Sequence, residues 1–139
     1  MRFLILRKAD ADTEAAQMPR QALVDAMGAY MGQMAEAGVL LAGEGLKPSS
    51  RGARVVFRRG HPTVTDGPFT EAKELIAGYT LIDVPSKAEA IAWLRRWPVE
   101  DADGNVALEL REVYEMADFA LEDTPAARTL DARPREGRS

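Results

Sequence analysis

Residues 76–98 read IAGYTLIDVPSKAEAIAWLRRWP and join a predicted strand to a predicted helix. The first nine residues are apolar and rich in β-branched and aromatic side chains, which is typical of a central strand. Ser86 and Glu89 have the spacing of a capping box, in which the two side chains satisfy free amide groups at a helix start. We therefore expect a helix from Ser86 to about Trp97, ended by Pro98.

A second strand-to-helix passage opens the chain. Residues 2–7 (RFLILR) place apolar side chains at both parities of the strand repeat, so we expect both faces of this strand to be covered. Pro19 suits the first turn of a helix that runs to Ala37, and Gly38 supplies a left-handed stop. The apolar residues of this helix recur at three- and four-residue steps: Leu23, Met27, Tyr30, Met31 and Met34. We interpret them as core packing, with a soft ligand-binding wall as the alternative.

The remaining predicted strands complete a repeating order of elements. They cover residues 39–42, 53–57, 63–65 and 106–113, and the middle two form a hairpin. The order is strand, helix, strand, hairpin, strand, helix, strand. It predicts an α+β fold of the ferredoxin-like split βαβ type, with an antiparallel sheet and both helices on one face.

Two helices cover only one face of such a sheet, so the other face needs a cover. In the last strand, Glu109 and Arg111 alternate with aliphatic residues, and we expect this charged pair on the face away from the helices. The simplest closure is a twofold homodimer that packs sheet on sheet. The alternative is a monomer in which the second face of the sheet is exposed to solvent and is partly covered by the C-terminal segment of the same chain.

Composition narrows the class of protein. The 139 residues suit one domain, and 46% hydrophobic with 29% charged residues is typical of a globular chain. The absence of cysteine excludes disulfides and thiolate metal sites, and a single histidine, His61, excludes a multi-histidine metal cage within one chain. We therefore expect no metal and no cofactor.

Charge and hydropathy bear on partners and location. The net charge of −4 opposes broad attraction to nucleic acid or anionic membrane, and the arginines near His61 are interpreted as a solvated basic edge. In the opening residues MRFLILRKAD the apolar run is interrupted by charged residues, so it is too short for a secretion signal or a membrane span. We expect a cytoplasmic protein with no nucleic-acid or membrane partner.

A motif in the middle of the chain resembles a known family. Residues 64–74 (VTDGPFTEAKE) and 77–84 (AGYTLIDV) are similar to the signature of the DGPF proteins within the YCII-related family. The first strand, residues 38–46 (GVLLAGEGL) and residues 106–111 (VALELR) follow in the order of that family. The resemblance implies a ferredoxin-like subunit of the dimeric α/β barrel type. We expect a YCII-related domain over residues 1–117 and a C-terminal extension over 118–139, with a short helix at 119–123 and then a mobile tail.

The resemblance implies less about function. Members of the wider family have been proposed to be enzymes because of a His and Asp pair, with the His on the first helix. This chain has no histidine between Met1 and Gly60 and carries Tyr30 in that helix, so the pair cannot be carried over. DGPF relatives are also described as transcription-associated, through proximity to alternative sigma factors.

Two acidic residues are the first candidates for chemistry. Asp66, beside a tight Gly-Pro turn, is expected to act as a general base or to bind a cationic group; the alternative is that it caps its own turn. Glu44 lies between two glycines, where the backbone can approach a ligand closely; the alternative is a β-bulge.

Three further residues are candidates for substrate binding. Tyr79 is expected to form an aromatic wall of the site and to present its hydroxyl to a substrate. The alternative is that Tyr79 is a residue of the core or of the dimer interface. Lys73 is expected to neutralise the charge of an anionic substrate. The alternative is that Lys73 is an ordinary surface charge. Arg111 would bind a polar ligand, or else form an interior ion pair with Glu109.

These residues lead to one functional hypothesis and one alternative. The hypothesis is a dimeric small-molecule-binding protein with metal-free acid-base chemistry in a cleft between two sheets, where Asp66 is the base. The alternative is a non-catalytic regulatory or interaction module associated with sigma-factor-dependent transcription. In that case the Asp-Gly-Pro-Phe motif is a structural turn.

Overall fold

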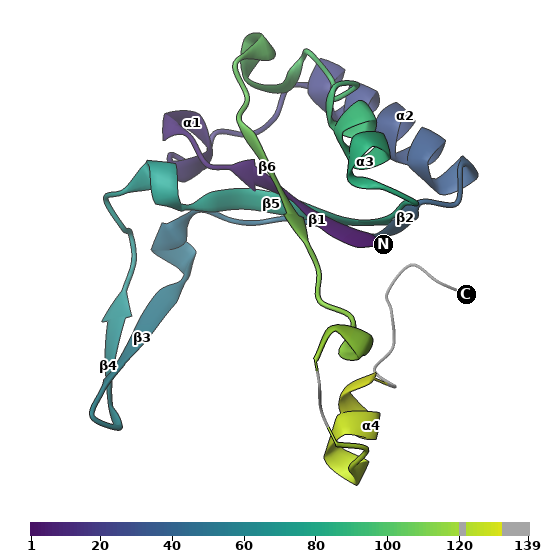
Figure 1. The fold of residues 1–139 in the computed structure, drawn as a ribbon. Helices are drawn as coiled ribbons and strands as arrows, with labels where there is room; N and C mark the ends of the chain where they lie inside the picture. Colours follow the sequence, from purple (N-terminus) through teal and green to yellow (C-terminus); the bar gives the residue numbers. More distant parts are fainter. Residues whose placement is uncertain (120–121, 132–139) are drawn as a thin grey trace.

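A computed structural model describes residues 1–119 and 122–131 of the chain (Figure 1). Four strands form one antiparallel sheet in the order β2-β5-β1-β6. They are β1 (Arg2–Lys8), β2 (Leu40–Gly45), β5 (Ile76–Asp83) and β6 (Leu108–Glu112). The helices α2 (Gln21–Glu36) and α3 (Lys87–Leu94) cover one face of the sheet. The predicted α+β, ferredoxin-like architecture is therefore confirmed.

Strand alternation determines which side chains enter the core. Phe3 and Ile5 of the central strand β1 are 2% and 0% exposed, whereas Leu4 and Leu6, which alternate with them, are half-buried. The core packs these residues against the two helices. Its buried members are Phe3, Ile5, Tyr30, Met34, Ile82, Val84 and Ala90. Only one face of β1 is covered by the described residues, so a cover over the other face stays a prediction.

Tyr30 joins the two helices. Its hydroxyl donates a hydrogen bond to the backbone carbonyl of Trp93 at 2.6 Å, and its ring makes edge contacts with Trp93 and Trp97. Burial raises the pKa of Tyr30 to about 12, although the positive charge of Arg96 acts in the opposite direction. The buried hydroxyl of Tyr30 therefore has a hydrogen-bond partner, and its ring packs against Trp93 of α3 and Trp97 after that helix.

Several element boundaries differ from the predictions. The short helix α1 (Ala11–Glu14) occupies a segment expected to be a loop, because Asp10 and Thr13 form a capping box at its start. Helix α3 ends at Leu94, one turn before the predicted Trp97. In the C-terminal extension, helix α4 (Pro125–Asp131) follows the segment predicted to be helical. The predicted tail begins at Arg128, but α4 includes residues 128–131, and the Thr124 hydroxyl accepts a hydrogen bond from the Ala127 N–H in the first turn of that helix. Residues 120–121 and 132–139 lie outside the described residues.

Four single turns of 3₁₀-helix complete the secondary structure. They are η1 (Ser49–Arg51), η2 (Ala72–Glu74), η3 (Asp101–Gly104) and η4 (Met116–Asp118). The first of them begins the loop that precedes the hairpin, and the third follows helix α3. Both contribute residues to the cleft described below.

A hairpin of β3 (Ala53–Arg58) and β4 (His61–Asp66) forms a separate two-stranded sheet. All of its residues are exposed. Figure 1 shows that this hairpin and the segment after β6 both extend away from the main sheet, on the side opposite α2 and α3. We call that side of the main sheet the bare face.

Candidate functional site

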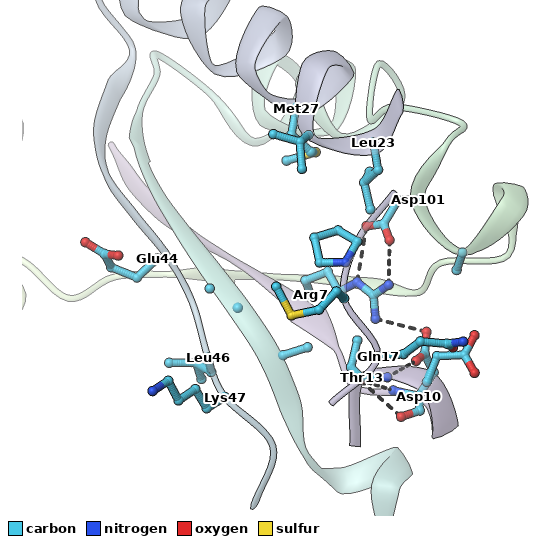
Figure 2. Close-up of a pocket in the computed structure, with 18 of the residues that line it drawn as sticks. Arg7, Asp10, Thr13, Gln17, Leu23, Met27, Glu44, Leu46, Lys47 and Asp101 are labelled. Carbon is cyan, nitrogen blue, oxygen red and sulfur yellow. Dashed lines mark hydrogen bonds and ion pairs between the residues drawn. The ribbon is translucent and has the colours of Figure 1, made fainter. Parts of the chain in front are cut away.

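A cleft of about 1340 Å³ lies between α2, one end of the main sheet and the loops that surround it (Figure 2). Strands β2 and β5 contribute glycines to it, at positions 43, 45 and 78. One wall is helix α2, and the rim includes residues 46–48 and 50–51 together with the segment around α1. A cleft of this size accommodates a small organic molecule.

The wall from α2 is apolar. Leu23, Met27 and Met31 line the cleft, and all three are partly buried. Tyr30 and Met34 of the same predicted stripe are instead buried in the core. Core packing is therefore confirmed for Tyr30 and Met34, and Met27 and Met31 also pack against the core. The first part of the stripe lines the cleft, and its role as a ligand-binding wall stays a prediction.

A cluster of charged residues stands at one end of the cleft, and we call Arg7, Asp10 and Asp101 the Arg7 cluster. The Arg7 guanidinium binds both carboxylate oxygens of Asp101, with Nη2 to Oδ1 at 2.5 Å and Nε to Oδ2 at 3.2 Å. Its Nη1 donates to Asp10 Oδ2 at 3.1 Å and to the carbonyl of Lys8 at 2.8 Å. Trp97 Nε1 donates to the same Asp101 carboxylate at 2.9 Å. Figure 2 shows the cluster below the apolar wall.

Burial and pairing fix the charge states of this cluster. Burial opposes ionisation of Arg7, yet hydrogen bonds and charge attraction from Asp101 and Asp10 raise its pKa. Burial likewise opposes ionisation of Asp10, but the backbone N–H of Thr13 and the Arg7 guanidinium lower its pKa. Each of the three guanidinium nitrogens of Arg7 donates to a protein oxygen, so this side chain positions two carboxylates. The Asp10 side chain retains 37% exposure.

The Asp-Gly-Pro-Phe motif holds the rim of the cleft in place. Gly67 N–H donates to the carbonyl of Gly52 at 3.1 Å, and Phe69 N–H donates to Ser49 Oγ at 2.9 Å. Ser49 in turn donates to the Glu14 carboxylate through both its N–H and its hydroxyl. A Cβ on Gly67 would lie 1.8 Å from the Ser49 carbonyl oxygen, so only glycine permits this contact. The motif therefore links α1, the rim loop and the hairpin base.

Glu44 and Tyr79 are the two predicted site residues among those that line the cleft. They face each other across β2 and β5, and strand alternation places their side chains on the bare face, opposite buried Thr80. Figure 2 shows the Glu44 carboxylate pointing away from the Arg7 cluster. The β-bulge of β2 lies between Leu40 and Ala42 rather than at Glu44.

The other three predicted site residues lie outside the cleft. Asp66 is exposed at the end of β4, and Lys73 is exposed in η2. Arg111 is on the bare face, with Nη1 3.6 Å from Glu109 Oε2. These two side chains are 70% and 46% exposed, so in the single chain their ion pair is a surface pair.

Sequence reasoning missed all three members of the Arg7 cluster. One signal was available, because Arg7 shares its parity with the buried Phe3 and Ile5. An arginine on the buried side of a strand needs carboxylate partners. Nothing local indicates that Asp101, 94 positions away, is that partner.

The described part of the chain contains no group of three or more His, Cys, Asp or Glu side chains arranged to hold a metal ion. Within residues 1–119 and 122–131, no helix combines the length and the hydropathy needed to cross a bilayer.

Comparisons with known proteins identify a family and find likenesses among solved structures. No curated protein matches the sequence. One solved structure that matches is 5-chloro-2-hydroxyhydroquinone dehydrochlorinase from Burkholderia phenoliruptrix AC1100, in complex with 2,5-dihydroxybenzoquinone. It is 18% identical, covers 83% of this chain and 95% of that chain, and superposes with a TM-score of 0.48. The family model of the YCII-related domain matches residues 1–117, and the chain therefore belongs to the YCII-related family.

Proposed function

We propose that this protein binds a small organic molecule in the cleft between α2 and the main sheet. The observation that carries the proposal is the hydrogen-bonded Arg7 cluster at one end of a cleft with an apolar wall. Apolar walls with a few fixed polar groups are typical of small-molecule sites, because the walls supply affinity and the polar groups supply orientation.

The accessible polar group of the cluster is the Asp10 carboxylate. Asp10 has a lowered pKa, so it is ionised at neutral pH and accepts hydrogen bonds. A suitable ligand therefore has a hydroxyl or amino donor at one end, directed at Asp10. Its apolar body would lie against Leu23, Met27 and Met31.

A thermal-shift screen against mixtures of small metabolites, followed by titration of each hit, tests this proposal. We expect Asp10→Asn and Met27→Gln each to weaken binding at least about tenfold. Glu109→Gln is the matched control, since Glu109 lies on the bare face, and it should leave the affinity unchanged. Equal weakening by the control and the two cleft variants would contradict binding at this place.

We retain Asp66 as the proposed base of a metal-free acid-base reaction, in a second cleft that pairing of two chains would form. The support is its exposed carboxylate on the side of the molecule where the bare face lies. Lys73, Tyr79, Glu44 and Arg111 would shape that second cleft. Once a substrate is known, Asp66→Asn should abolish turnover and leave binding between α2 and the sheet intact.

The alternative proposal is a regulatory or interaction module of the DGPF type. The observation in its favour is that Gly67 and Phe69 of the motif hold the rim loop through backbone hydrogen bonds. The absence of cysteine supports a cytoplasmic location for either function. A purified protein that binds no small molecule in the screen, but co-purifies with a sigma factor at fixed stoichiometry, would favour this alternative.

A further inference from the structure

The floor of the cleft consists mostly of backbone. Two directly opposed pairs of β2 and β5 line it, Gly45–Gly78 and Gly43–Thr80. Thr80 also pairs with the buried Ile5 of β1, so this is the side of the sheet that faces the helices. Glycines in a strand carry no side chain above the sheet and allow a ligand to approach the backbone closely. A flat ligand body therefore fits between this floor and the apolar wall of α2.

The Thr80 side chain is a buried polar group on this floor. Thr80 is 2% exposed, and its hydroxyl forms no hydrogen bond with the described residues. Among those residues, every fully enclosed side-chain nitrogen or oxygen has a hydrogen-bond partner, so the Thr80 oxygen is not fully enclosed. The space that it can face is the cleft, which Thr80 lines. A ligand group placed over this hydroxyl would supply the hydrogen bond that the protein does not.

Gly43 keeps the Thr80 hydroxyl accessible. A Cβ at position 43 would lie 3.6 Å from Thr80 Oγ1 and 3.5 Å from the Tyr79 carbonyl oxygen. Both are ordinary van der Waals distances, so alanine fits here without displacing the backbone. Packing therefore does not require glycine at this position, but a methyl group there would cover the hydroxyl.

The end of the cleft at the Arg7 cluster has an excess of negative charge. The carboxylates that line it outnumber the guanidinium groups: Asp10, Asp12, Glu100, Asp101 and Asp103 against Arg7 and Arg20. The ion pairs of the two arginines involve three of these carboxylates. Asp12 and Glu100 have no ion-pair partner among residues 1–119 and 122–131. This excess favours a cationic group over a neutral donor at the same place.

We infer that Thr80 is a specificity-determining residue for a ligand with an aromatic body, an amine cation at one end and a second polar group on the ring. The inference rests on the proposed binding in the cleft and names the chemical class of the ligand. The ammonium group lies at Asp10, the ring lies between the glycine floor and Met27, and the ring substituent hydrogen-bonds to Thr80. Thr80 is two residues from Gly78, the partner of Arg7, so about 7 Å of strand separates the two polar ends.

Three small probes that differ by one group test this inference. Tyramine carries an amine and a ring hydroxyl, phenethylamine lacks the hydroxyl, and 4-ethylphenol lacks the amine. In isothermal titration calorimetry, we expect wild type to bind tyramine at least about tenfold more tightly than either of the other probes. Thr80→Val keeps the shape of the side chain and removes its hydroxyl, so tyramine should then bind no more tightly than phenethylamine. Thr80→Ser keeps a hydroxyl and should keep the preference for tyramine.

Gly43→Ala is a second variant, which leaves Thr80 in place and covers its hydroxyl. It should remove the preference for tyramine as Thr80→Val does, and thermal unfolding checks that each variant is folded. Equal binding of tyramine and phenethylamine to wild type would overturn the inference, as would a preference that persists in Thr80→Val and Gly43→Ala. Absence of binding by all three probes at millimolar concentration would also overturn it.

Failure of the proposed function gives a different result. In that case the hits of the metabolite screen keep their affinity in Asp10→Asn and Met27→Gln. If those hits lose affinity in both variants while the Thr80 test fails, the cleft binds small molecules, but of another chemical class.

Discussion

Asp101 shows how one side chain holds the end of the cleft together. Its carboxylate is 7% exposed and accepts bonds from Arg7 and Trp97. We expect Asp101→Ala to lower the free energy of unfolding by about 3 kcal/mol, because it leaves the Arg7 guanidinium buried with too few partners. Urea denaturation measures this change.

The control for that variant is a surface ion pair with the same closest distance between charged atoms and a single hydrogen bond. Arg20 and Asp103 approach to 2.5 Å, but their side chains are 70% and 78% exposed. Arg20→Gln should therefore change the free energy of unfolding by less than about 1 kcal/mol. A loss as large as that of Asp101→Ala would mean that burial does not decide the strength of these pairs.

Because of Tyr30, we expect the free energy of unfolding to depend on pH in the alkaline range. Its pKa is about 12 in the folded chain against an ordinary value of 10.0, so the unfolded chain loses this proton first. The contribution of neutral Tyr30 to stability is complete below pH 10 and declines as the pH rises to about 12. We expect Tyr30→Phe to flatten this decline, and to cost about 1 kcal/mol at neutral pH through the lost hydrogen bond. Urea denaturation from pH 7 to pH 12 compares the two proteins. Parallel curves would exclude Tyr30 as the titrating group.

The periodicity of single residues predicted burial better than it predicted chemistry. Tyr30 and Met34 were expected in the core and lie there, because the three- and four-residue steps of a helix are a local property of the sequence. The partners of Arg7 come from a loop and from η3, and only the folded chain brings them together. Asp66 was chosen as a candidate because of the Gly-Pro turn that follows it. A turn is a local feature, so it does not predict which cleft the Asp66 side chain lies in.

At the scale of elements, the rim loop depends on how the Asp-Gly-Pro-Phe segment packs. Gly67→Ala would force Cβ into the Ser49 carbonyl, so we expect a loss of about 2 kcal/mol or more in the free energy of unfolding. Hydrogen exchange should speed up at Gly52 and Phe69, whose amides donate within this contact.

Helix α2 supplies the matched control. A Cβ on Gly28 meets nothing within 4 Å, so Gly28→Ala should stabilise the protein by about 0.5–1 kcal/mol through helix propensity. If both alanine variants had the same effect on stability, the close contact at Gly67 would have no energetic role.

The two long helices and the main strands were predictable because each carries its own signal. Capping by Ser86 and the three- and four-residue steps of α2 are properties of short windows. Helix α1 has only four residues, too few for a period to emerge, and its start depends on Asp10 and Thr13 alone. Its contact with the rim loop, through Glu14 and Ser49, joins segments 35 positions apart.

At the scale of the molecule, the bare face predicts sheet-on-sheet pairing. We expect Leu4→Lys, which places a charge in the middle of that face, to yield folded monomers in analytical ultracentrifugation. Val99→Lys is the control, since Val99 is 75% exposed and lies after α3, and it should remain dimeric. Dimers that persist in Leu4→Lys would mean that the chains meet elsewhere.

The order of the strands also constrains how the chain assembles as it is made. Strand β1 precedes both of its partners along the chain, and it is the inner strand that bonds to β5 and β6. Its second edge stays unpaired until residues 108–112 have been synthesised. Residues 108–112 must therefore be present before the sheet closes, and contacts between such distant segments slow the search for the native state. A nascent chain truncated after residue 107 should be degraded by proteases that spare the complete protein.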